Sequence, residues 1–196
     1  MYIDPWPSEE ETRAIYGDNY FQNTDFLKGN NEALFGYYDY IAERFSKQPK
    51  YARIAREILS LLPPLDRQPK ILEVGCGLGY FLDQAFEEGF DATGVEFNQY
   101  AVDRLRRKYA FPIISGGLES FEPEPARFDA VAMFDVIEHL RTPFDALDRI
   151  RELLSPSGVL VLSTMDSDSF VSRLLGKRLE DFRRTREHLF FFSRKQ

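Results

Sequence analysis

The stretch ILEVGCGLG, residues 71–79, decides the fold of this chain. Its first half is apolar, which is typical of a buried strand, and three glycines follow at alternate positions. Glycines at such a turn let the backbone adopt unusual torsions and approach a ligand closely. A helix is predicted directly afterwards, over residues 80–88, and Gly89 ends it. This order of strand, glycine turn and helix indicates the first unit of a parallel sheet.

Strands and helices are expected to alternate on both sides of this turn. The expected strands are residues 70–74, 91–96, 112–115, 128–134 and 159–163. The expected helices begin at Lys50, Tyr80, Asn98 as an N-cap, and Pro143 as the first helical residue. We expect the last of these helices to bury Phe144, Leu147, Ile150 and Leu154. The pattern predicts an α/β fold with helices on both faces of the sheet, and ligands in such sheets bind at the carboxyl ends of the strands.

Composition excludes several classes of protein. The chain has 196 residues, enough for one sizeable core, and a net charge of −7, which disfavours a nucleic-acid partner. Cys76 is its single cysteine, so an intrachain disulfide and a cysteine zinc site are excluded, and no metal ligands are predicted. Without a long apolar run or a signal sequence, we expect no membrane span and a cytoplasmic location.

Residues 1–48 are expected to form an N-terminal extension, and residues 49–196 a single domain. The extension is rich in aromatic residues but lacks sustained periodicity, and one short helix is expected around 37–45. Its rings could either cover a ligand as a lid or pack on the flank of the sheet. The candidate lid residues are Tyr16, Tyr20, Phe21, Tyr37 and Tyr38.

The glycine spacing discriminates between classes of ligand. A dinucleotide site requires G-x-G-x-x-G, but Tyr80 stands where the third glycine would be. A phosphate-binding P-loop requires a Lys-Ser or Lys-Thr pair, which does not follow here. The spacing is instead G-x-G-x-G, and an acid, Glu73, precedes the first glycine by two residues.

That combination resembles the first motif of class I S-adenosylmethionine (SAM)-dependent methyltransferases, with glutamate at the frequent aspartate position. Three further segments resemble the same family in the same order: GVE at 94–96, FDAVAMFDVIEHL at 128–140 and LSPSGVL at 154–160. The resemblance implies a Rossmann-like doubly wound, mostly parallel sheet of order 3-2-1-4-5. It also implies SAM as cofactor, S-adenosylhomocysteine (SAH) as product, and a small-molecule, glycan or lipid-linked acceptor.

The resemblance assigns roles to individual residues. Glu96 is expected to accept hydrogen bonds from both ribose hydroxyls, Phe97 to lie against the adenine, and Glu73 to act on the cofactor's ammonium group. Gly117 stands where relatives often carry the aspartate that meets the adenine amine, so backbone at Gly117 and Leu118, or the Glu119 side chain, could replace that contact. The full predicted cofactor site is Glu73, Gly75, Cys76, Gly77, Gly79, Glu96, Phe97, Asn98, Gly117, Leu118, Phe134 and Asp135.

The two histidines are the candidate catalytic residues. His139 follows the fourth strand, and His188 lies in EHLFFFS, residues 187–193, which resembles a segment bordering the acceptor cavity in related enzymes. Either imidazole could take a proton from an acceptor, and either could have only a structural role. Methyl transfer depends chiefly on alignment and the exclusion of water, so a catalytic base is not obligatory.

The chain ends soon after the fifth strand, where the family fold normally continues with two more strands. We therefore expect a C-terminally shortened domain whose edge strand, Val159–Ser163, must be covered by residues 166–193, by a partner chain such as a second copy, or by swapped elements. Two rival functions remain at this point: a shortened domain that binds the cofactor without turnover, and a nicotinamide-dependent oxidoreductase, which Tyr80 disfavours.

Overall fold

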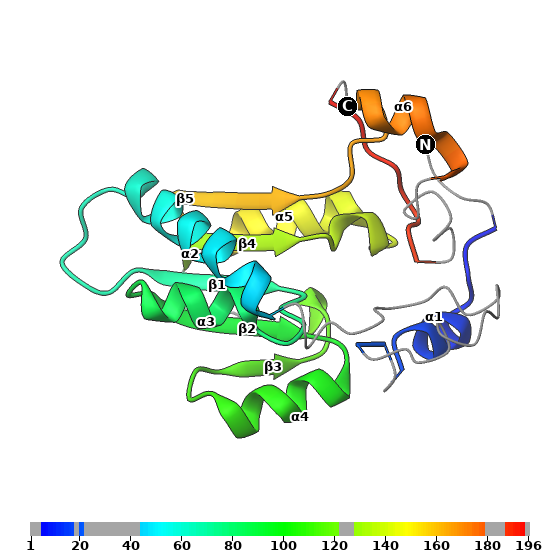
Figure 1. The fold of residues 1–196 in the computed structure, drawn as a ribbon. Coiled ribbons are helices and arrows are strands. Elements are labelled where there is room, and N and C mark those ends of the chain that lie inside the picture. The colour runs from blue at the N-terminus through cyan, green and yellow to red at the C-terminus, as the bar shows by residue number, and fades with distance from the viewer. Residues whose placement is uncertain (1–4, 18–19, 22–43, 122–127, 179–186, 195–196) are drawn as a thin grey trace. The chain divides into compact units, whose positions relative to one another are not determined.

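The computed structural model describes residues 5–17, 20–21, 44–121, 128–178 and 187–194. The chain divides into two compact units (Figure 1). One, the sheet unit, comprises Ala42–Phe134 and Phe144–Leu162. The other, the terminal unit, comprises Met1–Ile41, Asp135–Pro143 and Ser163–Gln196. The domain boundary expected between residues 48 and 49 stays a prediction.

A five-stranded parallel sheet of order β3-β2-β1-β4-β5 forms the centre of the sheet unit (Figure 1). The predicted fold class and strand order are therefore confirmed. The central strands are almost entirely buried because helices cover both faces, which explains their continuous apolar sequences. The strands are β1 Lys70–Val74, β2 Asp91–Glu96, β3 Ile113–Ser115, β4 Phe128–Phe134 and β5 Leu154–Ser163.

The register brings the carboxyl ends of the inner strands together at one edge of the sheet. Val74 of β1 pairs with Val95 of β2 and with Met133 of β4, and Glu96 pairs with Ser115 of β3. The segments that follow these strands therefore begin side by side. This is the edge at which open α/β sheets bind their ligands.

The helices of the sheet unit are α2 Arg44–Leu61, α3 Tyr80–Glu87, α4 Gln99–Lys108 and α5 Pro143–Leu153. Figure 1 shows α2 and α5 on opposite faces of the sheet. As predicted, Asn98 caps α4: its side chain accepts a hydrogen bond from the N–H of Ala101 at 2.9 Å. A short 3₁₀ turn, Leu118–Ser120, follows β3.

Three local predictions were wrong. Helix α2 begins at Arg44 rather than Lys50 and contains Pro49, because its packing against α3 outweighs the lost backbone hydrogen bond. In α5, Phe144 is 69% exposed, and Leu153 is buried in place of Leu154 because it shares a helix face with Ile150. Strand β5 begins at Leu154, five residues before the expected start at residue 159.

Three segments far apart in sequence make up the terminal unit. It contains α1 Glu9–Ile15, α6 Phe170–Leu175 and 3₁₀ turns at Ile137–His139 and Gly176–Arg178. Helix α1 begins with a capping box, in which Ser8 and Glu11 each accept a hydrogen bond from the other's backbone N–H. Arg141 donates to the carbonyl of Pro7, which joins the first segment to the second. Tyr37, Tyr38 and most of the helix expected at 37–45 lie outside the described residues.

Strand β5 occupies one end of the strand order, as expected for an edge strand. Its Leu162 is 39% exposed, and no described strand pairs with its outer side. Cover of this edge by a second copy of the chain stays a prediction. None of the described helices combines the length and apolar character needed to cross a membrane.

Candidate functional site

The glycine turn between β1 and α3 is held in a conformation that other residues would not readily adopt. Gly75, Gly77 and Gly79 have φ angles of 68°, 53° and 74°, all in the left-handed region. A Cβ at Gly79 would lie 2.6 Å from Cδ2 of Leu105 on α4, so close helix packing also requires glycine there. These torsions agree with the prediction that the turn needs glycines for its conformation, while close approach of the backbone to a ligand stays a prediction.

Glu96, the last residue of β2, organises the turn. Its carboxylate accepts a hydrogen bond from the N–H of Gly77 at 2.7 Å and another from the N–H of Asn98 at 2.8 Å. The side chain is buried, and burial raises the pKa of this carboxyl group, although the backbone N–H donors oppose that shift. These donors are the N–H groups of Asn98, Gly77 and Phe97, so an ionised carboxylate, which can accept about four hydrogen bonds, keeps capacity for at least one more.

Glu73 supplies a second buried carboxyl group beneath the same turn. It is 5% exposed, and its Oε2 has no hydrogen-bond partner among the described residues. Burial, and then the negative charge of Glu96, raise the pKa of Glu73 well above its usual value. A buried acceptor in this state favours a ligand that brings a donor or a positive charge.

Cys76 contributes backbone rather than thiol to the turn. Its N–H and that of Gly75 donate to the carbonyl of Val95, at 3.1 and 2.9 Å, and this ties the turn to β2. The sulfur faces Gly94, where a Cβ would lie 2.7 Å from it. Burial, followed by the charges of Glu96 and Glu73, raises the pKa of the thiol well above its usual value, so the thiol is unreactive.

The segment after β2 carries an exposed aromatic ring, Phe97, and the segment after β3 carries an acidic side chain, Glu119. Phe97 is 53% exposed, so it does not belong to the core and offers an apolar face to solvent. The N–H of Gly116 donates to the carbonyl of Glu96 at 2.9 Å, which joins these two segments. A Cβ at Gly117 would lie 2.3 Å from both carboxylate oxygens of Glu119. The Glu119 carboxylate therefore occupies the space that a side chain at position 117 would use, while Leu118 is buried.

Phe134 and Asp135, which follow one another at the end of β4, differ in their surroundings. The Phe134 ring packs against Phe81 and Tyr51 of the sheet unit, with centroids 4.9 and 5.7 Å apart. Asp135 begins the next segment with a φ of 54°, in the left-handed region. Its carboxylate accepts a hydrogen bond from the hydroxyl of Ser163 at 3.0 Å. These contacts, together with the hydrogen bond from the N–H of Asp135 to the carbonyl of Ser163 at 2.9 Å, tie the start of this segment to the end of β5.

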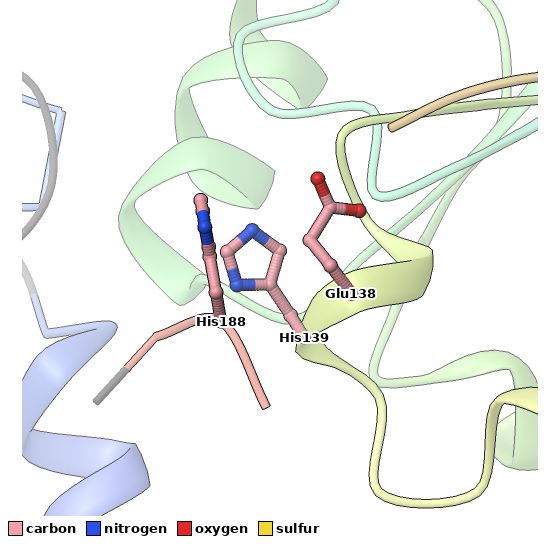
Figure 2. A group of neighbouring side chains, drawn as sticks. All are labelled: Glu138, His139 and His188. Atoms are coloured by element: carbon pink, nitrogen blue, oxygen red, sulfur yellow. The ribbon is translucent and has the colours of Figure 1, made fainter. Parts of the chain in front are cut away.

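Both predicted catalytic histidines lie in the terminal unit, and they are neighbours. The rings of His139 and His188 are 4.8 Å apart, and the Glu138 side chain lies on the other side of His139 (Figure 2). The carbonyl of Glu138 accepts hydrogen bonds from the N–H groups of Leu189 and Phe190 at 2.8 and 3.1 Å. These bonds hold two segments together that are about fifty residues apart in sequence.

The same unit surrounds the histidines with polar groups whose contacts sequence reasoning did not predict. Nδ1 of His139 lies 2.8 Å from the carbonyl oxygen of Glu187 and 2.9 Å from the hydroxyl of Tyr16. The Tyr20 hydroxyl donates to the buried carboxylate of Glu187 at 3.2 Å. A signal did exist in the sequence: the two histidines both occur in the tripeptide Glu-His-Leu, at 138–140 and 187–189.

Comparison with known proteins identifies the family to which the chain belongs. Residues 42–196 match the family described as a methyltransferase domain. The mitochondrial ubiquinone biosynthesis O-methyltransferase of Schizosaccharomyces pombe is 33% identical over 113 residues, which is 54% of this chain and 41% of that protein. The tRNA U34 carboxymethyltransferase of Azotobacter vinelandii is 30% identical over 174 residues, or 85% of this chain and 51% of that protein.

A solved structure shares the fold. The SAM-bound amino pentose methyltransferase CalS10 from Micromonospora echinaspora is 25% identical, with a TM-score of 0.54 over 63% of this chain and 53% of that one. The chain thus spans about half the length of each of these proteins.

Proposed function

The chain belongs to the methyltransferase domain family, and from that membership we propose that it transfers a methyl group from SAM to a small-molecule, glycan or lipid-linked acceptor. The observation that carries this proposal is the pair of buried carboxyl groups, Glu73 and Glu96, at the glycine turn. SAM brings an ammonium and a sulfonium cation and no phosphate. A dinucleotide would instead bring two phosphate charges against two buried acids.

The residues of the turn fit SAM group by group. Glu96 would accept hydrogen bonds from the ribose hydroxyls, and the Oε2 atom of Glu73 would act on the ammonium group. Glycine backbone at 75, 77 and 79 allows the methionine portion to approach closely. The exposed ring of Phe97 would cover the adenine, and Asn98, Leu118, Phe134 and Asp135 complete the proposed contacts.

Glu119 is the best candidate for the adenine amine. The family position usually held by aspartate is Gly117 here, and the Glu119 carboxylate fills the space beside it. A carboxylate oxygen there would accept from the exocyclic amine, as an acid at position 117 would. We therefore favour the Glu119 side chain over backbone at Gly117 and Leu118 for this contact.

When bound, SAM would supply a methyl group on a positively charged sulfur. The lone pair of an acceptor would attack the methyl carbon in line with the carbon–sulfur bond, and the sulfur would leave as a neutral thioether. The protein's part is to hold the reacting atoms in line and to exclude water. An acceptor that must lose a proton needs a base, and His139 or His188 is proposed for that role. The aromatic residues Tyr16, Tyr20 and Phe21 are proposed to form a lid over the site.

A direct test is calorimetric titration of the chain with SAH and, in parallel, with NAD. We expect SAH to bind and NAD not to bind. Binding of NAD without binding of SAH would refute the proposal that the chain uses SAM. Methyl transfer is then measured with labelled SAM on a panel of catechols, amino sugars, lipid-linked glycans and tRNA.

The panel also decides between the remaining alternatives. The net charge of −7 disfavours tRNA, although relatives include tRNA-modifying enzymes. Methylation of tRNA alone would overturn the proposed acceptor class. Binding of SAH with no methylated product from any acceptor would favour the alternative hypothesis, a domain that binds the cofactor without turnover.

A further inference from the structure

We propose that Glu138, His139 and His188 form a binding site for one divalent transition-metal ion in the terminal unit. Each residue offers one ligand atom, and these atoms all lie within 4.8 Å of one another. Figure 2 shows His139 between the other two side chains, all three gathered in one place. A modest change of side-chain torsions would bring the three atoms to metal-ligand distances of about 2.0–2.2 Å from a common centre.

Burial separates this cluster from an ordinary group of surface acids. Glu138 is 3% exposed and His188 is 7% exposed. Removal of a carboxylate from water is costly unless a cation or hydrogen-bond donors compensate. A divalent ion ligated by the carboxylate and the two imidazoles would place a positive charge directly beside this buried carboxylate.

The hydrogen bond of His139 prepares its ring for coordination. Nδ1 of His139 lies 2.8 Å from the carbonyl oxygen of Glu187, and because a carbonyl oxygen can only accept, this contact favours the tautomer with the proton on Nδ1. In that tautomer the lone pair of the neutral ring is on Nε2, the atom that would bind the ion. Metal-binding histidines characteristically donate their other ring N–H to a carbonyl or carboxylate, which fixes the tautomer and the ring orientation.

The donor set indicates which metals the site would take. Two imidazoles and one carboxylate suit Zn²⁺, Co²⁺ or Fe²⁺, whereas Mg²⁺ and Ca²⁺ prefer oxygen ligands alone. Three protein ligands leave at least one position for water or for an oxygen of a bound molecule. The ion would also connect the 3₁₀ turn at 137–139 to residues 187–190, which backbone hydrogen bonds already hold together.

His139 cannot bind a metal ion and act as a catalytic base at the same time, because both roles use the lone pair on Nε2. A proton shared between the imidazoles and Glu138 is thus the competing arrangement.

The test uses the full chain, stripped with a chelator and titrated with Zn²⁺ by calorimetry and with Co²⁺ by visible absorption. We expect one equivalent of Co²⁺ to bind and give the d–d bands of a four- or five-coordinate ion. Glu138→Gln and His188→Phe should each lower the affinity at least about 100-fold, the upper range for loss of a supporting group alone. Asp168→Asn, an acid in the same unit, is the matched control and should bind as the parent does.

A further variant keeps the test decisive if His188→Phe fails to fold. His188→Cys should retain binding and add a thiolate-to-cobalt charge-transfer band, which the parent lacks if buried Cys76 is no ligand. Absence of saturable Zn²⁺ and Co²⁺ binding, or affinity unchanged in Glu138→Gln and His188→Phe, would overturn the proposal. Because SAH binding is measured separately on the sheet unit's residues, failure of the metal site is distinguishable from failure of the proposed methyltransferase function.

Discussion

Replacement of Glu96 by glutamine is the sharpest test of the cofactor site. In the parent, both carboxylate oxygens accept from backbone, one from Gly77 and one from Asn98. Glutamine has nearly the same shape but only one accepting oxygen. Its NH₂ group must therefore face one of these two N–H groups, so either the glycine turn or the start of α4 loses its acceptor.

The magnitude follows from the contacts. A hydrogen bond to a charged group contributes about 1.5–3 kcal/mol. Loss of the charge removes at least one such bond to the ribose, so we expect SAH affinity to fall roughly 10- to 150-fold at about 1.4 kcal/mol per tenfold change. Disorder of the turn would add to this loss.

Calorimetry with SAH and its 2′-deoxy analogue measures the effect. Asp91→Asn, at the opposite end of β2, is the matched control and should bind SAH as the parent does. The parent should discriminate against the deoxy analogue, and Glu96→Gln should discriminate much less. Equal discrimination by both proteins, or unchanged SAH affinity in the variant, would refute the assignment of Glu96 to the ribose.

Three further predictions concern stability. The pKa of Glu73 is raised in the folded chain, so the contribution of Glu73 to the unfolding free energy falls as the pH rises above about 4.5. In urea melts near pH 7, Glu73→Gln should therefore be more stable than the parent, although it should bind SAH more weakly. A variant that is less stable than the parent at every pH would contradict this. Burial alone would raise the pKa of Asp129, but the hydrogen bonds from Arg67 and from the N–H of Lys70 outweigh it and lower that pKa, so Asp129→Asn should cost about 1.5–3 kcal/mol at neutral pH. That difference from the parent should shrink as acid protonates Asp129 below its usual pKa of 3.8, and a constant difference down to low pH would count against the ion pair. Gly94→Ala should lower the unfolding free energy by about 1–3 kcal/mol in thermal or chemical denaturation, since the new Cβ would lie within 2.9 Å of three side chains. An unchanged denaturation midpoint would show that these side chains can move aside without cost.

The central fold was predictable because its signals are local. Strands β1, β2 and β4 have the predicted bounds, since buried parallel strands are short apolar runs bounded by turns. Asn98 as a cap and Gly89 as a stop act within one helical turn of their own positions. The errors fell where tertiary packing decides, as at Pro49 inside α2 and at the exposed Phe144.

The sequence alone determined the sheet order and the acids of the glycine turn, through a resemblance that the family match confirms. Only the tertiary structure decided how those acids are held, because the partners of Glu96 come from different loops and the isolation of Glu73 depends on burial. The same holds for the histidines. The two Glu-His-Leu tripeptides do not show by themselves that their histidines lie together, and long-range backbone hydrogen bonds bring Glu138, His139 and His188 into one cluster.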